Sequence, residues 1–473
     1  MNKKIKSNID TNIYIRDFEK EYDLLKYKLG RWSIWPVLRF MVTIKLDNIP
    51  YDKVTSRKLY EYFKKIRYAF GDLIKLIKGI EQKDVLVISY SSNYSEIESG
   101  ASYDIFFDKL VIRLSSYFKI EHIDNLSFTK ARFPKQIEPD MTFSLFDLLV
   151  ALLSSIFLNK EIKDHAKVFS RLIMNELDLY EYTNKRVKRT FAYYFWSKKV
   201  YSWYLKMVNP KVILLLASYG ETGLIAAAKE LSIKTVEFQH GHVNRYHTGY
   251  SWGSYALDYK KSMLIPDEFF VYGDYYKKEL QVNGFWDKEI KVVGSSRMDK
   301  YRSLVVKKGV PGKMNITLTT SLLARQQTVD FFYDLLKNYQ EKLGIVLSVK
   351  MHPAESDRDI YLNKLQVFKD VRIIMIHETP STFELIKGAY FHTSVASSCH
   401  YEALALGVPT IILPFDQYGF VQDVIDIEGG FVARTAEDFV KIITDVKNFK
   451  IDETLANYFY KQCAIDNIIK ELY

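Results

Sequence analysis

The chain contains very little cysteine: only Cys399 and Cys463 occur among its 473 residues. Two cysteines cannot build a disulfide framework, and they cannot form a thiolate zinc site on their own. The sequence therefore predicts a protein of a reducing, cytoplasmic compartment. Glycine and proline are also scarce, with 20 and 11 residues, and no low-complexity tract or internal repeat is present. This composition is typical of a folded globular protein.

Long apolar runs are absent as well. The longest, "LFDLLVALLSSIFL" at 145–158, contains Asp147 and is shorter than the roughly 20 residues that a membrane span needs. We interpret it as a buried helix. The first residues, "MNKKIKSNIDTNIYIRDFEKEYD", are basic but carry no apolar segment of the kind found in signal peptides, so we expect no secretion signal.

Positive charge is concentrated at one end of the chain. The net charge is +10, and residues 1–80 hold 18 Lys and Arg against 9 Asp and Glu. Within them, residues 56–80 place apolar side chains at helical intervals with Lys and Arg between, which predicts a basic amphipathic helix. That helix could cover a core with one face, or it could dock on an anionic membrane surface. Nucleic-acid binding ranks below both because no binding motif accompanies the charge.

The order of the predicted elements indicates an α/β protein of two domains. Hydrophobic residues make up 48% of the chain, enough for two large cores. A buried strand is expected at 84–94, a long helical region at 142–207, and a strand, helix and strand at 211–217, 221–231 and 234–238. The last three form a βαβ unit, which belongs to a doubly wound parallel sheet.

The second half repeats the alternation of strands and helices. Short strands are expected in "EFFVYG" and "IKVVG", and later strands are expected at 315–321, 344–353, 371–377, 389–394 and 409–415. We predict an N-terminal Rossmann-like domain over 1–266, with helical insertions and a basic helical region, and a second Rossmann-like domain over 267–455. A C-terminal helix over 456–473 could cross back to the first domain. The loops after the strands would then line a central cleft between the domains, where such sheets bind ligands.

Candidate ligand-binding residues of the second domain lie at predicted strand ends. "LSVKMHPAES" brings Lys350, His352 and Pro353 to the end of one strand, a combination that suits a phosphate-bearing ligand. His352 could equally be an ordinary loop histidine. In "SVASSCHYEALALG", Ser397 and Ser398 open a helix, where hydroxyls and free N–H groups bind phosphate or simply cap the helix.

The ordered set "QHG", "KMHP" and "SVASSCHYEALALGVPTI", over residues 210–415, resembles bacterial GT-B-type transferases of capsule, teichoic acid and lipopolysaccharide synthesis. These include sialyl-, Kdo- and CDP-glycerol-type transferases. The resemblance implies a GT-B fold and a nucleotide-activated sugar donor, with a cytidine nucleotide slightly favoured, such as a CMP-linked ulosonic acid. Residues 1–209 match no family, so the acceptor stays open. The donor-binding residues implied or proposed are Thr320, Ser321, Lys350, His352, Pro353, Ser397, Ser398 and Glu402.

In transferases of this kind the first domain brings the acceptor and often the catalytic base. Glu221 in "SYGETG" follows a strand and begins a helix, so its carboxylate could deprotonate a sugar hydroxyl or only answer the helix dipole. His240 in "VEFQHGHVNRYH" is the second candidate, with Gln239, His242 and Arg245 as neighbours at the acceptor or cleft. Gln239 departs from the Trp-His-Gly form of glycerophosphate transfer and so favours a sugar donor.

We expect no metal and no cofactor. His240, His242 and His247 lack nearby cysteines or carboxylates that could complete a metal site, and GT-B transferases stabilise the leaving phosphate with helix dipoles and side chains. The prediction is a membrane-peripheral glycosyltransferase at the inner face of the cytoplasmic membrane. Its partners would be the donor, a glycan or lipid-linked glycan acceptor and an anionic membrane surface, without nucleic acid. Three alternatives remain: a polyol-phosphate transferase using a CDP-alcohol, a nucleotide-sugar 2-epimerase, which shares the fold, and a non-catalytic scaffold of capsule assembly.

Overall fold

The computed structural model describes residues 8–47, 58–90, 96–98, 101–125, 137, 139–306, 309, 312–322, 324–352, 355, 358–375, 378–415, 418–446 and 448–472. They fold into two compact units. The first unit takes the residues up to Val271, Tyr276–Val292 and the residues from Ile468 on. The second unit takes Tyr272–Tyr275 and Val293–Asn467.

The first unit is built on a seven-stranded parallel sheet in the order β11-β10-β9-β8-β3-β6-β7. Its strands are β3 (Val85–Tyr90), β6 (Ile120–Asn125), β7 (Met141–Thr142), β8 (Val212–Leu216), β9 (Lys234–Phe238), β10 (Glu268–Val271) and β11 (Ile290–Val292). The chain leaves β3 in one direction to β6 and β7, then returns to β8 on the other side of β3. The strand order therefore reverses between β3 and β8.

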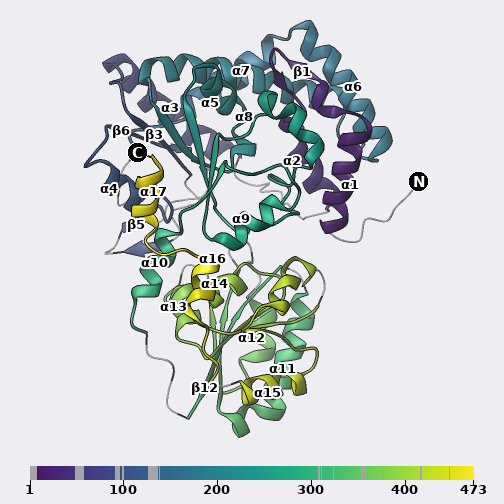
Figure 1. Ribbon diagram of the computed structural model, residues 1–473, viewed down its shortest axis with the longest axis vertical. Helices are drawn as coiled ribbons and strands as arrows, with labels where there is room; N and C mark the ends of the chain where they lie inside the picture. The colour runs from purple at the N-terminus through teal and green to yellow at the C-terminus, as the bar shows by residue number, and fades with distance from the viewer. Residues whose placement is uncertain are drawn as a thin grey trace. The chain divides into compact units, whose positions relative to one another are not determined.

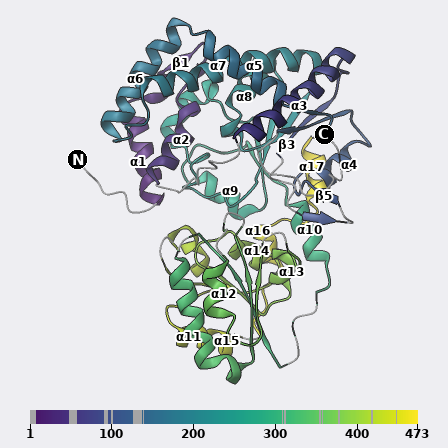
Figure 2. The same cartoon turned by 180° about the vertical axis from the view of Figure 1, so that it is seen from behind.

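Helices cover both faces of this sheet (Figures 1 and 2). The helices of the first unit, including α9, which begins in Tyr272–Tyr275, are α1 (Asn8–Glu21), α2 (Pro36–Leu46), α3 (Lys58–Lys78), α4 (Asp108–Leu114), α5 (Ser144–Ile156), α6 (Lys160–Glu176), α7 (Asn184–Val208), α8 (Thr222–Glu230) and α9 (Asp274–Gln281). Shorter pieces are η1 (Leu24–Lys26), η3 (Ser218–Gly220), η4 (Ser254–Ser262), β1 (Lys28–Leu29), β2 (Trp32–Ser33), β4 (Glu96–Glu98) and β5 (Ala101–Tyr103). One core joins α5, α7 and α8 to the sheet.

The second unit has a six-stranded parallel sheet in the order β14-β13-β12-β15-β16-β17. Its strands are β12 (Met314–Thr319), β13 (Ile345–Lys350), β14 (Val371–Ile374), β15 (Phe391–Ser394), β16 (Thr410–Ile412) and β17 (Gly430–Val432). The remaining elements are α10 (Ser296–Ser303), α11 (Arg325–Leu343), α12 (Asp359–Leu365), α13 (Thr382–Lys387), α14 (Cys399–Ala405), η5 (Tyr418–Asp426), α15 (Ala436–Asp445), α16 (Glu453–Phe459) and α17 (Ala464–Leu472). Here the strand order reverses between β12 and β15.

Local sequence explains where these elements begin. Strands β3 and β8 are short, mainly apolar runs buried on both faces, as parallel strands between helix layers require, and β15 is buried throughout although three of its four residues are polar. Helix α6 starts where the Asn159 side chain accepts the Ile162 N–H at 2.8 Å. Helix α13 starts at a capping box formed by Ser381 and Glu384. The two predicted parallel sheets with flanking helices are confirmed.

The predicted domain boundary at 266/267 is wrong. Strand β10 pairs in parallel with β9, and β11 pairs with β10, so both extend the first sheet. Asp267 fixes this edge, because its carboxylate accepts the N–H and hydroxyl of Thr235 at 2.8 Å each. The predicted single C-terminal helix is two helices, α16 and α17, and the chain passes from the second unit to the first within α17.

The helix predicted over 145–158 is present as α5, but the expectation that it is buried is wrong. Phe146 and Val150 are buried, whereas Leu152 and Ile156 are 57% and 59% exposed. The long helical region predicted over 142–207 is divided into α5, α6 and α7. Within the described part of the chain, no helix has the length and apolarity to cross a membrane.

Candidate functional site

Glu221 lies at the carboxyl edge of the first sheet, where the strand order reverses. The Tyr90 hydroxyl, at the end of β3, donates to Glu221 Oε1 at 2.9 Å and lies 3.3 Å from the Leu216 carbonyl at the end of β8. Ligands of open α/β sheets bind at such a reversal. The structure therefore places this predicted residue where a ligand is expected.

The turn that presents Glu221 is held by a buried carboxylate on the next strand. Ala217 takes a left-handed conformation, φ 48°, directly after β8, which is uncommon for a residue with a side chain. The following N–H, of Ser218, donates to Glu237 Oε1 at 3.2 Å, and the Tyr250 hydroxyl donates to the same oxygen. Burial raises the pKa of Glu237 to about 7 despite these bonds. Glu237, which the sequence did not single out, is thus the anchor of the turn.

A cavity of about 670 Å³ opens beside Glu221 within the first unit. Aromatic side chains from α2, α7 and η3 line it, namely Phe40, Tyr193, Tyr194, Tyr201 and Tyr219. Polar groups share the wall: Asp147, Arg189 and Glu221 line it, and the Tyr193 hydroxyl lies 3.4 Å from the Asp147 carboxylate. Its volume is that of a small-molecule site, and aromatic faces with a few polar groups suit a sugar ring.

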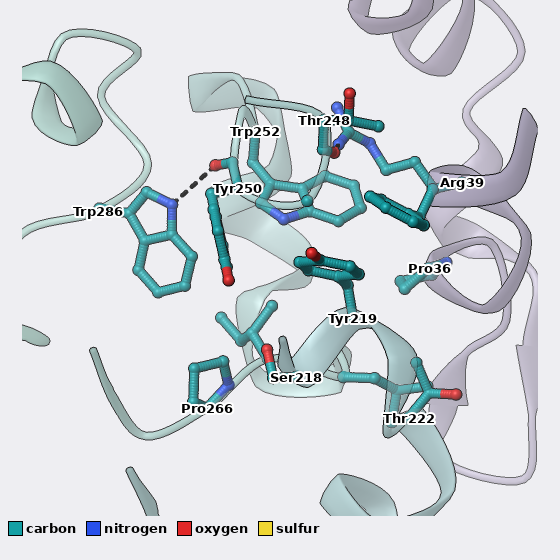
Figure 3. A pocket seen from close by; sticks show the side chains of 14 residues that line it. Pro36, Arg39, Ser218, Tyr219, Thr222, Thr248, Tyr250, Trp252, Pro266 and Trp286 are labelled. Carbon is teal, nitrogen blue, oxygen red and sulfur yellow. Dashed lines mark hydrogen bonds between the residues drawn. The ribbon is translucent and has the colours of Figure 1, made fainter. Parts of the chain in front are cut away.

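A packed aromatic cluster holds Tyr219 (Figure 3). Tyr219 also forms part of the wall of the Glu221 cavity. Tyr219 stacks on Phe40 with ring centroids 4.2 Å apart. On the other side, the Arg39 guanidinium lies over the Trp252 ring at 4.0 Å, and the Trp286 indole donates to the Tyr250 carbonyl at 2.8 Å. Only about 10 Å³ is open inside the cluster, too little for any ligand larger than a water molecule. The cluster therefore supports the turn rather than forming a second site.

Three histidines, His240, His242 and His247, follow β9, and His240 contacts Tyr219 of the cavity wall. Tyr219 Oη is 3.4 Å from His240 Nε2, and the His240 and His247 ring centroids are 6.5 Å apart. Burial lowers the pKa of His240 and of His242 to about 4, so both are neutral near pH 7. His240 Nδ1 is buried and has no hydrogen-bond partner. The structure thus links His240 to the Glu221 cavity through Tyr219.

Two predicted neighbours of His240 are engaged within the protein. Gln239 is fully buried, and its side-chain amide donates to the Gly241 carbonyl at 2.7 Å, so the prediction that it contacts an acceptor is wrong. Arg245 pairs with Glu279, with Arg245 Nε 3.0 Å from Glu279 Oε2. His242 is half-buried, with its ring centroid 6.0 Å from that of Tyr276.

The second unit has an equivalent edge where β12 and β15 end. The Ser394 hydroxyl donates to the Thr319 carbonyl at 2.7 Å and ties the two strand ends together. Beyond β12, the Thr320 hydroxyl donates to Glu355 and accepts the His352 N–H at 2.8 Å. The loops that carry Thr320, Ser321 and His352 are thereby joined at this edge of the sheet.

Arg325 is a cation of this edge that the sequence reading missed. It is the first residue of α11, follows Ala324 in a left-handed conformation (φ 53°), and lies with Nε 3.0 Å from Glu355 Oε1. Its side chain is 33% exposed while that of Glu355 is fully buried. Partial burial and then the nearby Arg325 lower the pKa of His352. A cation at the start of a helix is unfavourable because it opposes the helix dipole. The position of Arg325 was therefore a sequence signal that its charge is needed for something other than helix stability.

Lys350 does not belong to the donor-binding set. Its ammonium group donates to the carbonyls of Met375, Glu378 and Pro380 at 2.8, 2.6 and 3.0 Å, which uses all three of its N–H groups. Lys350 therefore holds the loop after β14, and the prediction that it binds phosphate is wrong. Pro353 lies outside the described residues.

The two serines and Glu402 lie on the loop and helix after β15. Ser397 Oγ accepts the Cys399 N–H at 3.2 Å, and Ser398, half-buried, precedes α14 without a capping bond from its side chain. Glu402, on α14, is half-buried; burial raises its pKa and Arg297 opposes that shift. The second unit thus brings Thr320, Ser321, His352, Arg325 and these three residues to one edge of its sheet. Among the described residues, no three His, Cys, Asp or Glu side chains gather as a metal site would require.

No protein-family model matches the chain, and no curated protein sequence is significantly similar to it. Solved structures do match. A provisionally assigned UDP-N-acetylglucosamine 2-epimerase from Listeria monocytogenes is similar with a TM-score of 0.51 and 14% identity, over 83% of this chain and 95% of that one. The UDP-GlcNAc 2-epimerase from Methanocaldococcus jannaschii gives 0.50 and 14%, over 82% and 99%.

A lipopolysaccharide outer core galactosyltransferase gives a TM-score of 0.48 at 12% identity, over 83% of this chain and 99% of that one, and supports no statement about this chain. At such identities the two epimerase structures show the fold alone. Together with the two parallel sheets, they confirm the predicted GT-B fold of two Rossmann-like domains.

Proposed function

We propose that the protein is a metal-independent GT-B glycosyltransferase that moves a sugar from a nucleotide-activated donor to a lipid-linked surface polysaccharide or lipopolysaccharide. One observation carries this proposal: Glu221 lines an aromatic cavity of about 670 Å³ in the first unit, whereas the phosphate-binding candidates belong to the second. A transferase needs a separate acceptor site with a base. A 2-epimerase, which converts a free nucleotide sugar, needs no such cavity.

In this scheme Glu221 is the general base. Its carboxylate takes the proton of an acceptor hydroxyl as that oxygen bonds to the anomeric carbon of the donor, and the bond from that carbon to the nucleotide phosphate breaks. The leaving phosphate takes the electron pair. Arg325 and the neutral His352 donate hydrogen bonds to it, aided by the hydroxyls of Ser321, Ser397 and Ser398. Tyr90, which donates to Glu221, holds the carboxylate in position.

The donor is proposed to be a cytidine nucleotide sugar, with Glu402 toward the ribose or base, because the motifs at 350–353 and 397–402 resemble those of cytidine-dependent transferases. The basic N-terminal region would keep the enzyme at the inner face of the cytoplasmic membrane, near its acceptor. Transfer of a polyol phosphate, epimerisation and a scaffold role are the alternatives that the experiments below separate.

Replacing Glu221 by Gln tests the base. Glu221→Gln should lower the rate of transfer by roughly 10²- to 10⁴-fold, because an amide cannot accept the proton. Nucleotide binding should be unchanged, since Glu221 lies in the other unit. The matched control is Glu161→Gln, which removes an exposed carboxylate from the first turn of α6. Full transfer activity in Glu221→Gln would remove Glu221 from the scheme, and conversion of the free donor without acceptor would favour the epimerase.

Nucleotide binding is tested by thermal shift with CMP, CDP, UDP, GDP and TDP. A ligand that binds only the folded state stabilises it by about 2.7 kcal/mol at 100 times its Kd. We expect CMP or CDP to raise Tm and expect His352→Ala and Arg325→Met to abolish the shift. Arg372→Ala, at an exposed arginine of β14, is the control. A response to UDP alone would redirect the donor assignment, and no response to any nucleotide would favour the scaffold.

A further inference from the structure

Helix α5 presents three different faces. Phe146 and Val150 are buried in the core of the first unit. A second face, with Asp147, Ala151, Ser154 and Ser155, lines the Glu221 cavity. The third face points outward and is apolar: Leu149, Leu152, Ile156 and the following Phe157 are 37%, 57%, 59% and 54% exposed. The helix that walls the proposed acceptor site therefore also carries an exposed apolar stripe.

This stripe differs from scattered exposed apolar residues, which need no explanation. Leu149, Leu152 and Ile156 follow one another at intervals of three and four, so they share one side of the helix. No charged residue occurs from Leu148 to Leu158, although charges are what normally keep an outward helix face in water. The stripe is therefore a continuous apolar surface whose exposure to water is unfavourable.

Helix α3 packs against α5 in the same helix layer, side by side in both views (Figures 1 and 2). It exposes a second apolar row: Ile66 is 43% exposed, Phe70 64% and Ile77 76%. Arg67, Lys75 and Lys78 are exposed on the same helix. Among the described side chains of α3, the one carboxylate, Asp72, is buried and accepts the Thr142 N–H and hydroxyl at 2.8 Å each.

The neighbouring helix α7 adds amphipathic aromatics to this layer. Trp203 is 49% exposed, and Lys199 lies 4.9 Å from the centre of the Phe195 ring. Apolar rows with Trp and Lys at their margins match the region where lipid headgroups meet acyl chains. A protein partner would not need the cations, whereas an anionic bilayer attracts each of them.

We propose that the outward faces of α3 and α5 insert into the headgroup region of an anionic bilayer, with Leu149, Leu152, Ile156 and Phe157 as the apolar contact. The Glu221 cavity then lies beside the membrane surface, since α5 forms part of its wall. Resting on the proposed function, this gives the acceptor class: a glycan whose lipid stays in the bilayer while its sugar enters the cavity.

Vesicle flotation tests the contact. The wild-type protein should float with phosphatidylcholine vesicles that contain about 30% phosphatidylglycerol and bind plain phosphatidylcholine much less. The double variant Leu152→Asp/Ile156→Asp should bind these anionic vesicles at least roughly tenfold more weakly, because two inserted apolar side chains are replaced by charged ones. Lys75→Glu/Lys78→Glu should also lose binding. The control is Val367→Asp, at a residue of the second unit that is 73% exposed, and it should bind as the wild type does.

Three results would overturn the inference: no flotation of the wild type, flotation of the α5 double variant equal to that of the wild type, or a wild-type dimer that the double variant converts to a monomer, which would assign the surface to a second copy. Thermal melting of each variant checks that it is folded. Flotation needs no donor, so the inference and the proposed function fail separately. If both hold, the double variant should transfer normally to a water-soluble acceptor and poorly to a vesicle-bound one.

Discussion

Glu221 follows β8 and Glu237 lies within the neighbouring strand β9, and the two carboxylates have different surroundings. Glu221 lines a cavity and accepts a hydrogen bond from Tyr90. Glu237 is fully buried, and its Oε2 has no hydrogen-bond partner. A buried carboxylate with one satisfied oxygen favours the protonated form. The turn that presents the proposed base therefore depends on a group that becomes charged near neutral pH.

The pKa of Glu237, about 7 in the folded protein, is above its ordinary value of 4.5. The folded state therefore binds the proton more tightly, and the stability that this gives is present below pH 4.5 and is lost as the pH rises through 7. Glu237→Gln, which cannot ionise, should gain stability over the wild type between pH 5 and 8, by up to about 3 kcal/mol. The melting temperatures of the variant and the wild type, compared at each pH across this range, measure this gain.

Glu230→Gln provides a comparison of opposite sign. Burial alone would raise the pKa of Glu230, but hydrogen bonds from Lys198 and Trp32 outweigh it and lower the pKa. The stability that ionised Glu230 contributes is present above the ordinary pKa of a glutamate and is lost in acid. Glu230→Gln should therefore be less stable than the wild type at pH 8, and this difference should shrink in acid. A pH-independent difference for Glu237→Gln would show that Glu237 is ionised in the folded protein throughout.

At the site, the sequence predicts which strand ends carry functional groups better than it predicts what each group does. Glu221 and His352 lie at the predicted edges because strand order alone brings them there. Lys350 was misassigned because the three carbonyls that hold its ammonium come from Met375, Glu378 and Pro380, which lie 25, 28 and 30 positions away. Arg325 was missed because its link to Glu355 spans two loops that only the folded sheet brings together.

Among the helices, α8 is positioned by one glycine. A Cβ added to Gly223 would lie 2.5 Å from Ser197 Cβ on α7, so the two helices approach more closely than any larger residue permits. Gly223→Ala should cost about 1–3 kcal/mol through overpacking and should lower transfer, because α8 begins next to Glu221. Urea unfolding followed by the aromatic fluorescence of α7 measures the loss.

The control for the α7–α8 contact is Gly220→Ala, in η3, where an added Cβ has nothing within 4 Å and the φ angle is ordinary. Its stability should stay within about 0.5 kcal/mol of the wild type. Equal stability of the Gly223→Ala and Gly220→Ala variants would mean that the helices separate at no cost.

The strands at 234–238 and 371–374 coincide with or overlap their predictions because they are short runs rich in β-branched and apolar residues. Strands β6, β7 and β17 were not predicted, because β6 is largely polar and the other two are only two and three residues long. The exposed face of α5 could not be predicted in this way. Apolar spacing shows that a helix side avoids water, but not whether protein, lipid or a ligand covers it. The same ambiguity held for α3, whose sequence allowed two interpretations: a helix that covers a core with one face, or a helix that docks on an anionic membrane surface.

At the scale of the molecule, the chain passes between the units four times, at 271/272, 275/276, 292/293 and 467/468. A boundary drawn from the sequence at one position could not represent this, because nothing local distinguishes an edge strand of one sheet from the first strand of the next. Close packing accompanies these passages. A Cβ on Gly273 would lie 2.3 Å from the carbonyl oxygens of Tyr458 and Phe459.

The C-terminal segment completes the second unit, and Phe459 is its anchor. Phe459 is fully buried, with ring centroids 5.1 Å from Tyr275 and 5.6 Å from Tyr401 on α14. Phe459→Ala should destabilise the second unit by about 3–5 kcal/mol and weaken nucleotide binding, because α14 carries Glu402. Hydrogen exchange of α14 should rise, whereas Lys461→Ala, at an exposed side chain, should leave it unchanged. Unaltered exchange in Phe459→Ala would show that α14 is held without this segment.

The passage within α17 also sets an order of events during synthesis. The first unit receives its last piece, from Ile468 on, only after Val293–Asn467 has been translated. At cellular elongation rates that delay is roughly ten to thirty-five seconds. For that time a nearly finished first unit waits on the ribosome while the second unit is made. A chaperone that shields the incomplete unit would therefore act on a nascent chain rather than on a released protein.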